Sequence, residues 1–153
     1  MRGARRTDLD GLDEALRLTP TLTRTLFREV MQNAGERFLS LHQSGKVPQI
    51  DRLIESHAWT DAAFALIGFA IPKWSIRRII RADVEWYCSL SQQPNLPIEL
   101  DDGAEASHEV LPLAILRAFI AARRRDALAP QAVSAVPQIR SAPAFVYCCD
   151  NYA

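Results

Sequence analysis

The sequence predicts a single α+β domain in which a β-hairpin packs between helices. Apolar and polar residues alternate with a period of two over residues 74–91, on both sides of a short turn. The stretches 21–43, 61–70 and 104–125 instead place their apolar residues at helical spacing. Because an isolated hairpin is only marginally stable in water, helices must cover one of its faces. We therefore expect a helix–β-hairpin–helix (αββα) unit over residues 58–125.

Length and charge limit the classes of function. A chain of 153 residues fits one domain, and its 18 basic and 18 acidic residues leave no net field that would attract nucleic acid or a membrane surface. The most apolar window, residues 62–71, is about half of the ~20 residues needed to span a bilayer. Acidic residues between Asp8 and Glu14 occupy the place where a signal peptide needs an apolar stretch. We expect a cytoplasmic protein that does not enter the membrane.

The N-terminal part of the chain predicts helices. Residues 1–20 form an arm, with a loose start and a short helix over 8–18. The domain proper runs over 21–125, and its first element is an amphipathic helix at 21–43. Gly35 lies in the middle of that helix and costs ~1 kcal/mol relative to Ala. The segment is therefore either one helix or two.

Two shorter helices are expected next. Residues 49–57 carry an apolar side typical of a short helix. Thr60 is a suitable N-cap for the helix over 61–70, and Asp61 suits the positive end of its dipole. This helix is apolar almost all round, which indicates burial on most sides.

The hairpin register follows from keeping its apolar residues on one face. A three-residue loop at 81–83 does this, whereas a two-residue turn would mix the two faces. The predicted pairs are Ile80 with Val84, Arg78 with Trp86, Ile76 with Cys88, and Trp74 with Leu90.

The C-terminal third contains one strong helix. Residues 104–125 have a broad apolar side, but Pro112 is disfavoured inside a helix. The helix therefore either begins near residues 108–111 or is kinked there. Residues 126–153 lack a clear period and contain three prolines, which predicts a disordered, flexible tail.

His108, beside Glu109, is the histidine best placed for chemistry. It follows the acidic loop at Asp101 and Asp102, and a general base needs such a carboxylate neighbour. A cleft formed by His108, Asp101 and Asp102 would bind a ligand. A histidine among carboxylates at a helix start is, however, more often a solvated cap.

Cys148 and Cys149 are the most unusual pair in the chain. Adjacent thiols bind a soft metal or form a vicinal disulfide, yet no further ligand than Asp150 lies near them. The simpler interpretation is part of a tail. No cofactor is expected, because the sequence has no glycine-rich phosphate loop and no G-x-S-x-G elbow.

Arginines and aromatics share the hairpin, and aromatics on a sheet face can stack nucleic-acid bases. Here we expect both tryptophans, Trp74 and Trp86, in the core, which argues against nucleic-acid binding on this pattern and leaves it as a third hypothesis. The residues concerned are Arg77, Arg78, Arg81, Trp74, Trp86 and Tyr87.

Several short motifs resemble a group of small hypothetical proteins of rhizobial alphaproteobacteria. The resemblance covers about residues 50–125 and implies a bacterial cytoplasmic protein, with no functional residues to carry over. The motifs are Trp59-Thr60-Asp61-Ala62-Ala63, Pro72-Lys73-Trp74 with Arg77-Arg78, Glu85-Trp86-Tyr87-Cys88-Ser89-Leu90-Ser91, Leu96-Pro97 and Leu113-Ala114-Ile115-Leu116.

The leading functional hypothesis is a non-enzymatic accessory or protein-interaction module. It depends on a compact core without a constellation of catalytic groups, and its partner would be another protein or a second copy of the chain. The alternatives are a small enzyme or ligand-binding protein that uses the cleft near His108, and a weak nucleic-acid binder that uses arginine-rich segments.

Overall fold

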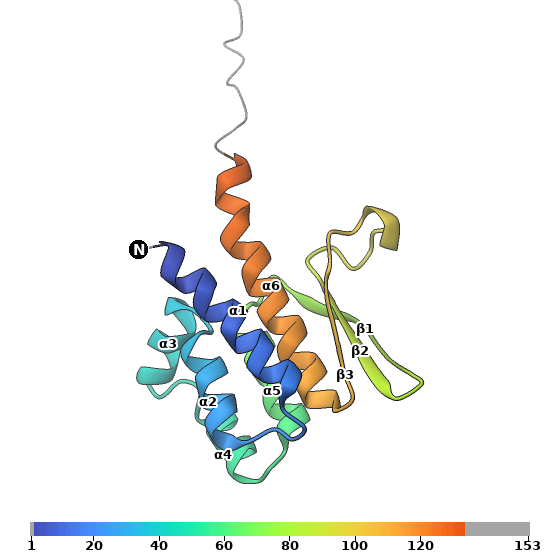
Figure 1. The fold of residues 1–153 in the computed structure, drawn as a ribbon. Coiled ribbons are helices and arrows are strands. Elements are labelled where there is room, and N and C mark those ends of the chain that lie inside the picture. The colour runs from blue at the N-terminus through green and yellow to red at the C-terminus, as the bar shows by residue number, and fades with distance from the viewer. Residues whose placement is uncertain (1, 134–153) are drawn as a thin grey trace, which may run out of the picture.

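Six α-helices and a three-stranded antiparallel sheet make up residues 2–133, the part of the chain that this computed structural model describes (Figure 1). The predicted α+β class is confirmed. The helices are α1 (Arg2–Leu18), α2 (Arg24–Gln32), α3 (Glu36–Gln43), α4 (Pro48–Glu55), α5 (Trp59–Ala70) and α6 (Leu111–Val133). The strands are β1 (Ser75–Ala82), β2 (Glu85–Ser91) and β3 (Ala104–His108), in the order β1-β2-β3, and a 3-10 turn η1 (Ile98–Leu100) lies between β2 and β3.

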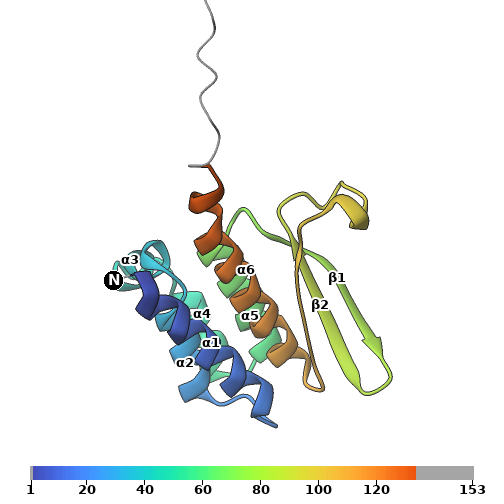
Figure 2. The same ribbon diagram turned by 45° about the horizontal axis from the view of Figure 1, so that its top comes forward.

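Helix α6 is the central element of the fold. It packs against α1 and α5 on one side and against β2 and β3 on the other, so it lies between the N-terminal helices and the sheet (Figure 2). A helix that is apolar all round is stable only when it is covered all round. Eight of its residues are 0% exposed, namely Leu113, Ala114, Ile115, Leu116, Ala118, Phe119, Ile120 and Ala122.

Helix α1 begins at Arg2, so the prediction of a loose start was wrong. Its apolar stripe of Leu9, Leu12 and Leu16 is buried in the common core. An ion pair fixes the helix to α6, because Arg117 Nε donates to a carboxylate oxygen of Asp13 at 2.9 Å. Helix α1 is therefore stabilised by its contact with α6, which is distant in the chain and cannot be predicted from the local sequence.

The segment 21–43 forms two helices, α2 and α3, that meet at Gly35. This glycine has a φ of 108°, a conformation that residues with a Cβ rarely adopt. A Cβ at this position would also lie 2.9 Å from a guanidinium nitrogen of Arg123. The backbone angle thus explains the break at Gly35, whereas the Arg123 guanidinium is the end of a flexible side chain that can move aside.

Helix α5 starts two residues earlier than the sequence predicted. Its first residue is Trp59 and its N-cap is Ala58, which makes no side-chain hydrogen bond, so the prediction of Thr60 as the cap was wrong. Ala62, Leu66 and Ile67 are among its buried residues, in line with the expected burial.

The hairpin over residues 74–91 is confirmed, but its register differs from the prediction. The connection has two residues, Asp83 and Val84, and Asp83 adopts a left-handed φ of 55°, which Asp tolerates. The ladder is irregular at Arg77, between Ile76 and Arg78. The extra residue there shifts the register of β1 against β2. The apolar residues of β2 therefore stay buried although the turn has only two residues. The observed pairs are Ile76 with Leu90, Arg78 with Ser89, Ile79 with Cys88, Ile80 with Tyr87, and Arg81 with Trp86.

Residues 104–108 form a third strand, where the sequence analysis placed the start of a helix. The strand pairs with β2, and its partners there run from Trp86 to Leu90. Helix α6 then begins at Leu111 with Pro112 in its first turn, which agrees with the expected start near residues 108–111 and not with a kink there. The αββα unit is thus extended by one strand, to αβββα.

Helix α6 runs to Val133, past Arg125, where the predicted helix ended. The remainder of the predicted tail, residues 134–153, lies outside the described residues.

Candidate functional site

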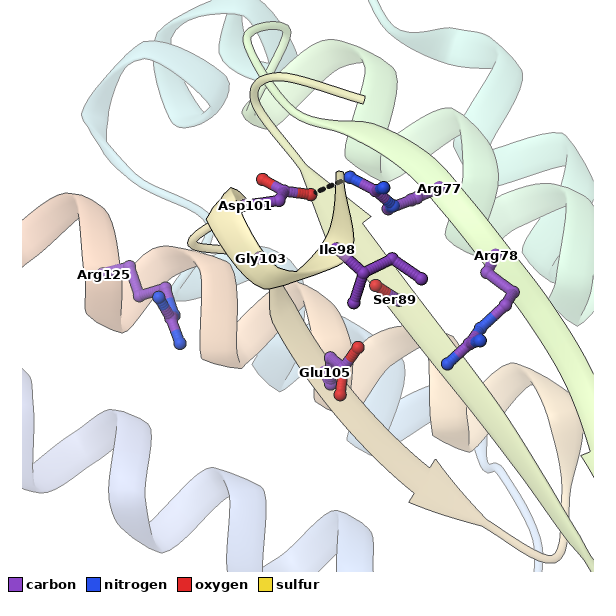
Figure 3. Close-up of a pocket in the computed structure, with 8 residues that line it drawn as sticks. All are labelled: Arg77, Arg78, Ser89, Ile98, Asp101, Gly103, Glu105 and Arg125. Atoms are coloured by element: carbon purple, nitrogen blue, oxygen red, sulfur yellow. Dashed lines mark hydrogen bonds and ion pairs between the residues drawn. The ribbon is translucent and has the colours of Figure 1, made fainter. Parts of the chain in front are cut away.

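A polar pocket of about 350 Å³ lies between the outer face of the sheet and the loop that joins β2 to β3 (Figure 3). Every strand contributes to it, as do η1 and α6. Its lining residues are Arg77, Arg78, Ser89, Ile98, Asp101, Gly103, Glu105 and Arg125. Histidine and cysteine are not among them, so this lining offers no nucleophile paired with a base.

An ion pair between Arg77 and Asp101 anchors the loop to the sheet. The two side chains are only 16% and 7% exposed, and Arg77 also donates to the carbonyl oxygen of Leu96 at 2.6 Å. The second oxygen of Asp101 accepts a hydrogen bond from Ser91 Oγ at 2.9 Å. The β1 irregularity thus places Arg77 where it holds both ends of the loop, and the pocket wall is fixed before any ligand arrives.

Helix α6 closes another side of the pocket through Arg125. Its guanidinium donates to the backbone carbonyl of Asp102 at 3.0 Å and pairs with the Asp102 carboxylate. The next residue, Gly103, lies so close to the sheet that a Cβ at this position would be 2.9 Å from the carbonyl oxygen of Leu90. Only glycine lets this loop enter β3 so close to β2.

Three polar side chains in the pocket form a row across the sheet. Arg78 of β1 is opposite Ser89 of β2, which is opposite Glu105 of β3. Ser89 is 7% exposed, whereas Arg78 and Glu105 are exposed. Within residues 2–133 none of the three side chains forms a hydrogen bond or an ion pair. The pocket therefore presents a cation, a hydroxyl group and an anion that are free to bind.

His108 lies at the opposite end of β3 from Asp101 and Asp102, so the structure does not bring the three predicted residues into one cleft. The Nδ1 atom of His108 accepts a hydrogen bond from the Val110 amide at 2.9 Å, and the residue is 9% exposed. His108 thus stabilises the turn into α6, while Asp101 belongs to the pocket described above.

Cys148 and Cys149, proposed as metal ligands, lie outside the described residues. Among the residues that the structure does describe, no group of three or more His, Cys, Asp or Glu side chains could hold a metal ion. Cys88 is buried, and this burial raises the pKa of its thiol to about 11, so it is a poor nucleophile near neutral pH.

The hairpin aromatics do not form an open stacking surface. Trp74 is buried, and its Nε1 donates to Asp126 at 3.0 Å. Trp86 is half-buried, with the Arg81 guanidinium carbon 5.7 Å from its ring centroid. Of the aromatic side chains on the strands, Tyr87 is the exposed one. The expected placement of both tryptophans against the core agrees with the structure.

Strand β1 is an edge strand that extends beyond the helices. Its substantial packing within the described residues is against β2, whereas α6 covers β2 and β3 (Figures 1 and 2). Large apolar side chains along the hairpin are exposed as a result, and they are Ile76, Ile80, Val84 and Tyr87.

Sequence reasoning singled out Asp101 but missed its partner Arg77, and it missed Gly103 and Arg125 entirely. The predicted register is a regular ladder, and such a ladder does not turn Arg77 towards the β2–β3 loop. The one available signal was the sequence Asp101-Asp102-Gly103 itself, which is typical of a tight connection.

Comparisons of the chain with protein-family models, with curated proteins and with solved structures found no match. A search of the described residues found no helix that is long and apolar enough to cross a bilayer.

Proposed function

We propose that this chain is a non-catalytic protein-interaction module of a bacterial cytoplasm, and that its interface is the free edge of β1. The observation that carries the proposal is an eight-residue edge strand that lies beyond the helical cover. Its outward N–H and C=O groups have no strand partner within residues 2–133, and such a row is a template for another strand.

Exposed apolar side chains support the same surface. Ile80 is 40% exposed and Val84 is 66% exposed, although both are large and apolar. An added strand would lie beside Ile80 and cover part of its exposed side chain. Burial of such surface contributes about 25 cal/mol per Å², which supplies affinity beyond the backbone hydrogen bonds.

Charge favours an acidic partner over a second copy of the chain. Strand β1 contains Arg77, Arg78 and Arg81 and no acidic residue. Arg77 is neutralised by Asp101, but pairing two β1 strands would still bring four exposed guanidinium groups, Arg78 and Arg81 of each copy, to one seam, and like charges on paired strands are destabilising. An extended segment that alternates acidic and aliphatic residues matches both the charge and the period of two.

The test uses a synthetic eight-residue peptide that alternates Glu and Val, with NMR and amide hydrogen exchange of the full chain. We expect the peptide to protect amides of β1 from exchange, while amides of α1 stay unchanged. A Lys–Val peptide of the same pattern should bind more weakly, and a version with a central proline should not bind.

A matched pair of variants locates the interface. Ile80→Glu should weaken the Glu–Val peptide about tenfold, since it removes apolar contact and adds repulsion, worth ~1.4 kcal/mol together. Leu18→Glu changes a residue of α1 that is 65% exposed, and it should leave binding unchanged. Equal binding by both variants, or no protection of β1 by the peptide, would contradict the proposal. Protection of β1 that rises with protein concentration alone would identify a second copy as the partner instead.

A further inference from the structure

We infer that the pocket under the β2–β3 loop is a binding site for a small zwitterion, of the class of free α-amino acids. This site lies on the outer face of the sheet under the loop, and although it includes Arg78 of β1, it does not depend on the proposed partner. The inference begins with the charges that line the pocket (Figure 3).

Internal pairing neutralises most of those charges. Arg77 pairs with Asp101, and Arg125 pairs with Asp102. After these pairs are removed, one cation and one anion remain in the lining, at Arg78 and Glu105. A ligand with a single negative charge would face Glu105 unfavourably, and one with a single positive charge would face Arg78. A molecule that carries both charges satisfies both residues.

The register of the strands sets the spacing of these two charges. Arg78 and Glu105 flank Ser89 on neighbouring strands, so their Cα atoms are separated by two strand spacings, roughly 10 Å. Long side chains reaching inward from both sides leave room for a carboxylate and an ammonium group between them. A guanidinium binds a carboxylate through two parallel hydrogen bonds, which fixes the orientation of the ligand.

Ser89 provides the polar contact at the centre of the site. It is 7% exposed and its hydroxyl has no hydrogen-bond partner in the part of the chain that the structure describes. The hydroxyl is not one of the fully buried unpaired polar atoms of the described residues, and it lines the pocket, so a ligand can reach it as a hydrogen-bond donor or acceptor. Ile98 of η1 lines the same pocket and offers an apolar contact for a ligand side chain.

The pocket is also of suitable size and is built in advance. Its volume of about 350 Å³ lies within the range typical of small-molecule sites. The largely buried Arg77–Asp101 pair holds the loop in place, so binding requires little ordering of the backbone. Since Arg78 and Glu105 are exposed, we expect millimolar rather than tight binding.

The test is an NMR titration of the full chain with leucine, N-acetylleucine, leucine amide and inorganic phosphate. Leucine should shift the amides of Ser89, Gly103 and Glu105. The acetylated and amidated compounds each lack one charge and should bind about two- to fivefold more weakly, the upper part of the range expected for one exposed ion pair. Equal shifts with all three compounds, tighter binding of phosphate, or no shift with leucine at tens of millimolar would overturn the inference.

Variants assign the roles within the site. Arg78→Gln and Glu105→Gln should each weaken leucine binding about fivefold. Glu99→Gln is a control in the same loop, because Glu99 is exposed and does not line the pocket. Ile80→Ser removes apolar surface from the proposed β1 interface without placing a carboxylate beside Arg78, and it should retain leucine binding, which separates this site from that interface. An equal loss of leucine binding in the Glu99→Gln variant would mean that the overall charge of this surface, and not the pocket, determines binding.

Discussion

Replacing Asp101 by Asn should destabilise the chain through the loop that covers the pocket. The carboxylate accepts hydrogen bonds from Arg77 and from Ser91 Oγ, and it is 7% exposed. Asn keeps the shape of the side chain, but it removes the charge and leaves the Arg77 guanidinium unpaired in a largely buried place.

The size of this effect follows from the burial of the pair. Breaking a fully buried ion pair costs about 3–5 kcal/mol, and an exposed pair is worth about 0–1 kcal/mol. The Arg77 side chain is 16% exposed, so Asp101→Asn should cost about 2 kcal/mol. With a urea dependence of about 2 kcal/mol per M for a chain of this size, the unfolding midpoint should fall by roughly 1 M.

The assay is urea unfolding followed by tryptophan fluorescence, with Glu14→Gln as the control. Glu14 also forms an ion pair with an arginine, Arg17, but both side chains are more than half exposed. The control should therefore leave the midpoint within measurement error. If Asp101→Asn lowered the midpoint no further than Glu14→Gln does, the loop would not depend on this pair, and the argument that the pocket is built in advance would be wrong.

Three further perturbations test other parts of the fold. Gly103→Ala should cost about 1–3 kcal/mol of unfolding free energy, measured by urea unfolding, because its Cβ would press against the Leu90 carbonyl. For Cys88, burial raises the pKa of the thiol from 9.0 to about 11, so the native state holds its proton where the unfolded state has lost it. Stability should consequently fall as the pH rises from 9 to 11, and Cys88→Ala should remove that part of the pH dependence in thermal unfolding. Arg117→Met should cost about 2 kcal/mol in the same urea assay, because Asp13 and a backbone carbonyl of β3 lose a partly buried charged donor; an unchanged midpoint would contradict this.

The sequence was informative where local pattern decides structure. Helix α5 and strands β1 and β2 could be predicted, because their apolar residues repeat at the spacing of a buried helix or strand, whatever surface they pack against. The strand β3 was missed because Ala104–His108 contains small and polar residues with little strand propensity. Its structure comes from pairing with β2, which is a long-range interaction.

In the candidate site, too, the sequence revealed what local pattern marks and missed what long-range pairing decides. Asp101 and Asp102 stood out as acidic residues in a loop, and both carry ion pairs in the structure. Their partners are arginines 24 and 23 residues away, and not His108 as expected. The irregularity at Arg77 determines which arginine meets Asp101, and no local pattern marks it. Pairing across such distances cannot be inferred from spacing alone.

The central position of α6 has a consequence for how this protein is made. Among the described elements, α6 is the last to leave the ribosome, yet α1, α5 and the sheet all depend on it for their apolar contacts. The leucines of the earlier helices therefore stay exposed to solvent until residues 111–133 have been synthesised. We expect folding to complete only after translation has passed that point. A nascent chain stalled before α6 should accordingly be the form that chaperones recognise and proteases cut.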